Sequence, residues 1–141
     1  MRLYLDTSAL VKLYVEEDGS GAVRRAVGQS RPVATSAVAY VEARAAFSRR
    51  RNEGHLTAAE HRRVVRDLDA DWDRFLRLEV TEPLIREAAD LAEAHRLRAY
   101  DAIHLASARV MKERLGGTVL FASWDTHLER AAAREGLEKI H

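Results

Sequence analysis

Four acidic side chains are the residues of this sequence whose type and spacing could do chemistry. They are Asp6, Glu42, Asp101 and Asp125. Asp6 ends an apolar segment that is typical of a buried strand, and Asp125 lies three residues after a second such segment. Carboxylate oxygens suit hard divalent ions such as Mg²⁺ or Mn²⁺, whereas zinc favours histidine or cysteine ligands. We interpret the four acids as one metal site.

Glu42 is the acid that is hardest to explain by packing. Its helical neighbours three and four residues away are Val38, Ala39, Ala45 and Ala46, so its carboxylate lies on the apolar face of a predicted helix. An unpaired charge on such a face is costly. A metal ion, an arginine partner, or a side chain that reaches out to solvent would each account for it.

The three aspartates also have an ordinary structural interpretation. An aspartate at the start of a helix caps backbone N–H groups that have no other partner. Asp6, Asp101 and Asp125 each fit that interpretation when they are considered singly. At Asp125 there is a competitor, because Thr126 and Glu129 have the spacing of a capping box.

The elements that must position these acids follow from apolar periodicity, which predicts strands alternating with helices. The expected strands cover residues 2–5, 33–35, 76–80 and 118–122. The expected helices cover residues 8–15, 20–29, 36–54, 57–75, a segment that begins after Thr81, 101–115 and 126–135. We predict an α/β fold with one domain over residues 1–141. It has a central, mainly parallel sheet of about four or five strands flanked by about seven helices.

A parallel sheet of this kind brings the acids together. Ligands bind beyond the carboxyl ends of its strands, where helix N-termini also point. Asp6 and Asp125 follow strands, and Asp101 is expected to open the central helix, so three segments converge on one edge. Crowded carboxylates repel one another, which predicts a raised pKa for at least one of them in the metal-free protein.

The composition is that of a soluble globular protein, with 47% apolar and 32% charged residues. The net charge of +1 argues against indiscriminate binding of nucleic acid. The absence of cysteine excludes disulfides and thiolate zinc sites. Asp6 and Lys12 interrupt the N-terminal apolar stretch and no long apolar run follows. We therefore expect neither a secretory signal nor a membrane span, and a cytoplasmic location.

Four motifs, DTSAL, TSAVAYVEA, RAYDAIHLA and FASWD, occur in this order and at spacings that resemble a PIN domain. The resemblance covers almost the whole chain. It is strongest to the VapC-like toxins, compact single-domain ribonucleases of bacterial and archaeal toxin–antitoxin pairs. By this resemblance Asp6, Glu42, Asp101 and Asp125 match the acidic positions of the family's metal site. Two neighbouring hydroxyl positions are matched by Ser8 and Ser123.

The resemblance implies an endoribonuclease that depends on Mg²⁺ or Mn²⁺ and cleaves RNA phosphodiester bonds. It also implies a homodimer and an antitoxin partner that blocks the active-site cleft. Within the site we assign Asp6 and Asp101 as direct metal ligands. Glu42 and Asp125 are left to bind through water, to hold a second ion, or to orient the nucleophile.

Arginine makes up 20 of the 23 basic residues, and its planar fork suits phosphate groups. Two groups of arginines fall on the two helices predicted between residues 36 and 75. The RNA-binding candidates are Arg49, Arg50, Arg51, Arg62, Arg63 and Arg66. The alternative is a solvated helical face, with the first three arginines complementing a helix C-terminus.

Other interpretations remain open. A free-standing PIN nuclease with a housekeeping role in RNA processing and a catalytically silent binding module both fit the motifs. A phosphatase of the haloacid-dehalogenase type is disfavoured, because it needs a second aspartate where Ser8 stands. His104 follows Asp101 by three residues, and we interpret it as a core histidine with a satisfied N–H group rather than as a general base.

Overall fold

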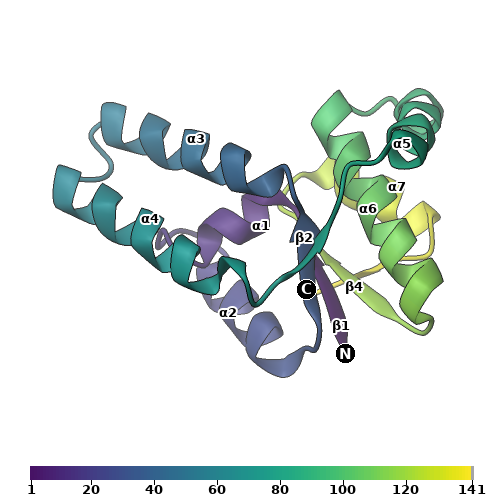
Figure 1. The fold of residues 1–141 in the computed structure, drawn as a ribbon, viewed down its shortest axis with the longest axis horizontal. Coiled ribbons are helices and arrows are strands. Elements are labelled where there is room, and N and C mark those ends of the chain that lie inside the picture. Colours follow the sequence, from purple (N-terminus) through teal and green to yellow (C-terminus); the bar gives the residue numbers. More distant parts are fainter. Residues whose placement is uncertain (141) are drawn as a thin grey trace.

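The computed structural model describes residues 1–140 and shows five parallel strands with helices on both faces (Figure 1). The strands are β1 (Arg2–Leu5), β2 (Val33–Ser36), β3 (Leu76–Leu78), β4 (Val119–Ala122) and β5 (Glu138–Lys139). Their order in the sheet is β3-β2-β1-β4-β5. Leu3 in the central strand β1 is paired with Val33 on one side and Leu120 on the other. The central position explains why β1 is apolar on both faces.

Seven helices cover the sheet in the described part of the chain. They are α1 (Thr7–Lys12), α2 (Ser20–Gln29), α3 (Ala39–Asn52), α4 (Ala58–Trp72), α5 (Glu82–His95), α6 (Ala99–Leu115) and α7 (Thr126–Arg134). Leu3 and Leu5 face a core formed with α1 to α4. Tyr4 points to the opposite face, where it packs against α5, α6 and α7. The alternation along β1 therefore divides the interior into two layers.

Helices α3 and α4 form an arm that projects from the sheet (Figure 1). Phe47 of α3 and Leu68 of α4 are buried in the same apolar cluster, which joins the two helices. Thr57 begins α4 with the predicted capping box, in which its side chain accepts from the Glu60 N–H and the Glu60 carboxylate accepts from the Thr57 N–H.

The predicted fold class is confirmed: the sheet is parallel, and its five strands and seven helices agree with the predicted four or five strands and about seven helices. The short strand β5 was not among the four segments expected to be strands. Element boundaries differ by a few residues. Helix α6 begins at Ala99 rather than at Asp101, because the Arg98 carbonyl already accepts from the Ala102 N–H. The predicted domain extends to residue 141, which lies outside the described residues. Within residues 1–140, no helix is both long enough and apolar enough to cross a membrane.

Candidate active site

A cleft of about 590 Å³ opens between α1, α3 and the start of α6. Its lining includes the hydroxyls of Thr7 and Ser8 and the carboxylates of Glu42 and Asp101. Thr7 and Ser8 follow the carboxyl end of β1, so the cleft lies at the sheet edge where the sequence predicted a site.

Asp6 directly precedes the lining residues Thr7 and Ser8 but does not line the cleft itself, and it is only 3% exposed. Its Oδ1 atom accepts a hydrogen bond of 2.9 Å from the Ala9 N–H, which caps α1, and one of 2.6 Å from the Ser8 hydroxyl. Burial raises the pKa of Asp6, although the nearby His104 and the hydrogen bonds of Ser123 and Ser8 oppose the shift. A raised carboxylate pKa was predicted, but its main cause is burial rather than repulsion between acids.

Glu42 projects from the first turn of α3 into the cleft. Its Oε1 atom accepts from the Thr7 hydroxyl at 2.7 Å and lies 2.9 Å from Nε2 of His104. Partial burial raises the pKa of Glu42, but the bonds from His104 and Thr7 outweigh burial and hold the pKa below its ordinary value. The partner of this carboxylate is thus a histidine and a threonine, not an arginine. Within residues 1–140, its Oε2 atom has no hydrogen-bond partner.

His104 supports Glu42 from the core and is 2% exposed. Its Nδ1 atom lies 2.7 Å from the Tyr4 hydroxyl. An ionised Glu42 can only accept, so Nε2 carries a proton, and in the neutral ring Nδ1 then accepts from the Tyr4 hydroxyl. Burial raises the pKa of Tyr4 well above its ordinary value, so this hydroxyl stays protonated. The interpretation of His104 as a satisfied core histidine is confirmed.

Asp101 and Asp125 are joined by one cation, the guanidinium of Arg98. Arg98 donates from Nε to Asp101 Oδ2 at 3.1 Å and from Nη2 to Asp125 Oδ2 at 3.2 Å. The Arg98 side chain is 81% exposed, so this bridge lies on the outer side of the site. Asp101 is the third residue of α6 and does not cap it, which contradicts the cap interpretation at this position.

Asp125 is both a helix cap and a member of the acidic group. Its Oδ1 atom accepts from the Leu128 N–H at 2.9 Å, while Oδ2 faces Arg98. The cap of α7 is therefore Asp125 itself, and the alternative capping box of Thr126 with Glu129 is wrong.

The two predicted hydroxyls connect the loops that carry Asp6 and Asp125. Ser8 donates to Asp6 and accepts from the Trp124 N–H at 3.1 Å. Ser123 is fully buried, accepts from the Asp125 N–H at 3.0 Å and also contributes a hydrogen bond to Asp6. These bonds hold the ends of β1 and β4 in a fixed relation.

The chemistry of the donors fits a hard divalent cation. All four acids offer oxygen atoms, and the carboxylates of Asp101 and Asp125 already converge on a positive charge, that of Arg98. Within residues 1–140, however, no three His, Asp or Glu side chains are grouped closely enough to form a ready metal site. Each acid instead has a protein partner, which an incoming cation must rearrange or share.

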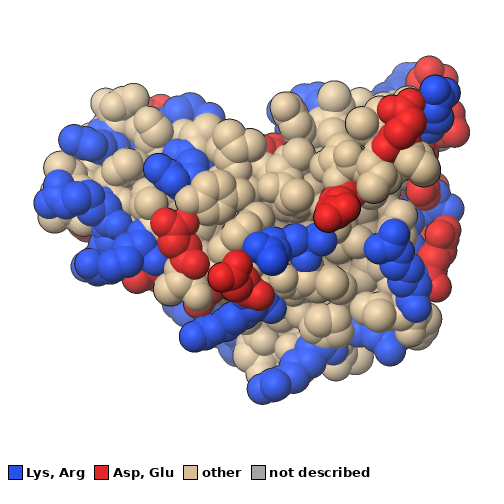
Figure 2. Space-filling view, viewed as in Figure 1, with Lys and Arg blue, Asp and Glu red and all other residues tan. Residues whose placement is uncertain are grey.

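The RNA-binding candidates divide into two sets. Arg49 and Arg50, in the last turn of α3, line the cleft, whereas Arg51 is exposed outside it. The α4 candidates, also exposed outside the cleft, are Arg62, Arg63 and Arg66. Figure 2 shows several Lys and Arg side chains at the outer end of the arm. The role of the six candidate arginines in binding RNA stays a prediction.

Sequence reasoning missed Thr7, Tyr4, Arg98 and Lys12 as parts of this region. A polar tyrosine in the middle of a central apolar strand was the available signal for Tyr4. Arg98 could have been suspected from its spacing of three residues to Asp101, which places the two side chains on one helical face.

The family model of the PIN domain matches residues 3–134. The chain therefore belongs to the PIN domain family. It is 35% identical to Ribonuclease VapC45 of Mycobacterium tuberculosis over 134 residues, which is 95% of this chain and 91% of that protein.

Two solved structures share the fold. FitAcB from Neisseria gonorrhoeae superposes with a TM-score of 0.67 at 18% identity and covers 99% of this chain and 96% of its own. A toxin-antitoxin complex from Klebsiella pneumoniae superposes with a TM-score of 0.63 at 16% identity. The match covers 89% of this chain and 88% of the chain in that complex.

Proposed function

We propose that this protein is an endoribonuclease that hydrolyses RNA phosphodiester bonds and serves as the toxin of a toxin–antitoxin pair. One observation carries the proposal: Glu42 and Asp101 line one cleft, and Asp6 and Asp125 are bonded to residues that line it. The similarity to a protein named as a ribonuclease, over nearly the whole chain, supports the same reaction.

The proposed cofactor is Mg²⁺ or Mn²⁺. Asp6 and Asp101 are the proposed direct ligands, and Glu42 and Asp125 act through water or at a second ion. Such an ion, when bound, lowers the pKa of a water molecule and stabilises the charge on a phosphodiester transition state.

The chain itself contributes orientation. His104 and Thr7 hold Oε1 of Glu42 and leave Oε2 available to orient an attacking water molecule. The Ser8 hydroxyl and the Ala9 N–H fix Asp6, so its second oxygen keeps one direction. Groups held in this way lose little freedom during the reaction, which favours catalysis by positioning.

The proposed macromolecular partners are RNA, a second copy of the chain in a homodimer, and an antitoxin, in the cytoplasm. Solved structures of this fold include a toxin-antitoxin complex, which supports the antitoxin. We propose that an antitoxin segment places an arginine or an acidic side chain near the carboxylates. An arginine there would compete for the oxygens that Arg98 now holds.

The decisive experiment is an RNA cleavage assay with purified protein. A pool of single-stranded and hairpin RNAs is incubated with Mg²⁺, with Mn²⁺ or with EDTA, and the products are resolved by size. Cleavage with either ion and none in EDTA is the expected result. Full activity in EDTA would overturn the metal assignment, and no cleavage of any RNA with either ion would overturn the proposed activity.

A further inference from the structure

Lys12 lies in the cleft, yet the proposed catalytic groups do not use it. It ends α1, lines the same cleft as Glu42 and Asp101, and its side chain is only 11% exposed. Its ammonium donates to Glu17 Oε1 at 3.1 Å and lies 5.0 Å from the centroid of the Trp124 ring. Within residues 1–140, its other two N–H bonds have no hydrogen-bond acceptor. The Glu17 carboxylate and the Trp124 ring stabilise this ammonium, and its two remaining N–H groups are available to an anion in the cleft.

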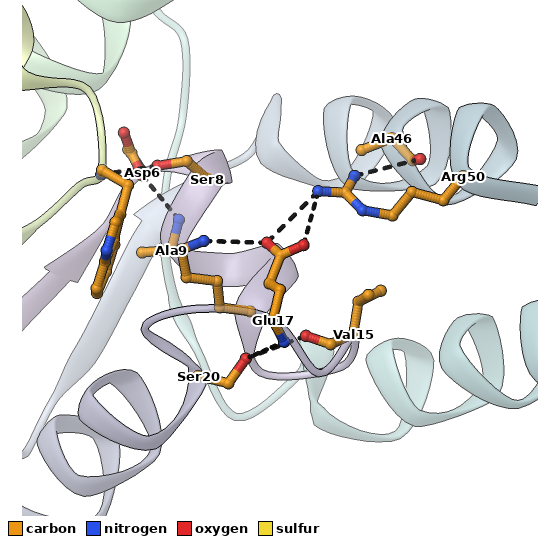
Figure 3. Close-up of polar contacts among 10 residues, drawn as sticks. Asp6, Ser8, Ala9, Val15, Glu17, Ser20, Ala46 and Arg50 are labelled. Carbon is orange, nitrogen blue, oxygen red and sulfur yellow. Dashed lines mark hydrogen bonds and ion pairs between the residues drawn. The ribbon is translucent and has the colours of Figure 1, made fainter. Parts of the chain in front are cut away.

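Arg50 brings a second cation to the same carboxylate. It lines the cleft from the last turn of α3 and donates from Nη2 to Glu17 Oε2 at 3.0 Å. Its Nη1 makes a longer contact of 3.5 Å with the Ala46 carbonyl, and within the described residues its Nε–H has no partner. Figure 3 shows the Glu17 carboxylate facing the Arg50 guanidinium across the space between α3 and the α1–α2 loop.

The backbone of Glu17 is held in place by hydrogen bonds through the Ser20 side chain. Its N–H donates to the Ser20 hydroxyl at 3.0 Å, and that hydroxyl donates to the Val15 carbonyl at 3.1 Å (Figure 3). The carboxylate therefore holds an ammonium from α1 and a guanidinium from α3 at set positions. Two positive charges and one negative charge leave one net positive charge with unused donors in the cleft.

A purely structural role explains only part of this cluster. One cation would be enough to pair Glu17 and to tie the loop to a helix. A second cation, with donors left free and lining the cleft that holds the acids, indicates a place for an anion. Lysine supplies a compact charge and arginine a planar fork, a combination suited to phosphate oxygens.

We propose that Lys12 and Arg50, oriented by Glu17, form a subsite for a phosphate group of the RNA next to the phosphate that is cleaved. This inference rests on the proposed ribonuclease function and deepens it. The carboxylates repel phosphate unless a cation is bound, so a separate anion subsite holds the strand in the cleft. Such a contact positions the strand without reading its sequence.

The test compares Lys12→Met, Arg50→Gln and Glu17→Gln with the control Lys139→Met. Lys139 is an exposed residue of β5 outside the cleft, so the control removes the same charge elsewhere. Binding of a short fluorescein-labelled single-stranded RNA is measured by anisotropy in EDTA over a series of NaCl concentrations. The KM and kcat for cleavage are measured with Mn²⁺, and melting temperatures are recorded for all variants.

Lys12→Met and Arg50→Gln are expected to weaken RNA binding and to flatten the salt dependence by about 0.7 in slope for each lost phosphate contact. Loss of a charge-assisted hydrogen bond should raise KM about tenfold while kcat stays nearly constant. Glu17→Gln keeps the shape of the cluster and removes its negative charge, so RNA binding should be equal to or tighter than that of wild type. Lys139→Met should behave as wild type.

Opposite outcomes separate the two proposals. If both cation variants keep the wild-type salt slope and KM while wild type cleaves RNA, the subsite is wrong and the proposed function stands. If wild type binds RNA through Lys12 but does not cleave it, Lys12 and Arg50 remain a phosphate-binding site, but the nuclease and the position of the site beside a cleaved phosphate are both overturned. If wild type neither binds nor cleaves RNA, both are overturned.

A purely structural cluster predicts a different pattern. Lys12→Met and Glu17→Gln would then lower the melting temperature alike and leave RNA binding unchanged, which would overturn the subsite. If Lys12→Met does not fold, Arg50→Gln at its partly exposed position decides the question. Lys12→Arg, which keeps the charge, should restore most of the binding.

Discussion

Asp6, Glu42 and Asp101 are acids of one cleft region, but each is held in a different environment. Asp6 is buried, which raises its pKa. Glu42 receives bonds from His104 and Thr7, which lower its pKa. Asp101 is partly exposed and is paired with Arg98. Removal of the charge should therefore have a different consequence at each residue.

Asp101→Asn tests whether Asp101 is a metal ligand or has only a structural role. Asp101 does not cap α6 and its ion pair involves an exposed arginine, so the metal-free variant should keep nearly the wild-type stability. In wild type, Mg²⁺ at about 100 times its dissociation constant adds about 2.7 kcal/mol. That corresponds to a melting shift of about 2–4 °C per kcal/mol. The variant should lose most of this shift and its RNA cleavage, and retention of both would exclude Asp101 as a ligand.

Asp6→Asn should stabilise the metal-free protein at neutral pH. The folded-state pKa of Asp6 is raised above its ordinary value of 3.8, so its favourable contribution is present below that value and is lost as pH rises through the raised pKa. Asparagine can still accept from Ala9 and Ser8, which keeps the cap. Melting in EDTA should show an advantage for the variant that grows with pH and disappears in acid.

Glu42→Gln is the matched comparison, because the pKa of Glu42 is shifted in the opposite direction to that of Asp6. The pKa of Glu42 is lowered in the fold, so its ionisation contributes stability above its ordinary value of 4.5 and that contribution is lost as pH falls through the lowered pKa. The variant should be less stable than wild type at neutral pH, with a deficit that shrinks in acid. Parallel pH profiles for the two variants would contradict the different environments described for the two acids.

Tyr4→Phe tests the hydrogen-bond chain behind Glu42. The variant leaves Nδ1 of the buried His104 without a donor, which should cost about 1–3 kcal/mol of unfolding free energy. Tyr14→Phe is the control, because the Tyr14 hydroxyl donates to Asp71 at a partly buried position. Denaturant unfolding should show the larger loss for Tyr4→Phe, and equal losses would argue against the assigned His104 tautomer.

At the scale of elements, the arm formed by α3 and α4 is predicted to bind RNA. Replacing Arg49, Arg50 and Arg51 together with alanine should weaken RNA binding and reduce the salt slope by up to about one unit per lost contact. The α4 candidates, which lie outside the cleft, are tested separately in a triple alanine variant of Arg62, Arg63 and Arg66, and a reduced slope there would show that α4 also contacts phosphate. An unchanged slope in the α3 variant would return its arginines to a role at the helix C-terminus.

At the scale of the whole molecule, the toxin role predicts that the free protein arrests growth. Overexpression of wild type alone in its native host should stop growth, and co-expression of the cognate antitoxin should restore it. Asp101→Asn at equal protein level is the control and should be harmless. Unaffected growth despite RNA cleavage in vitro would instead favour a free-standing nuclease with a housekeeping role.

Much of the architecture was predictable from local patterns. A strand apolar on both faces, helices with distinct caps and the alternation of the two are properties of short segments, so β1, the cap at Thr57 and the parallel sheet were all expected. The position of acids after strands follows from the same local reasoning. The predicted ends of helices were less exact. The first turn of α6 forms through backbone hydrogen bonds, and no side chain in that segment indicates where they begin.

What only the tertiary structure decided is which side chains meet. Glu42 and His104 are 62 residues apart, and Tyr4 and His104 are 100 residues apart. Lys12 enters the cleft beside Arg50 only because α1 and α3 pack on the same face of the sheet. Long-range packing brings such partners together. The periodic pattern of one segment does not indicate which distant side chain will pack against it.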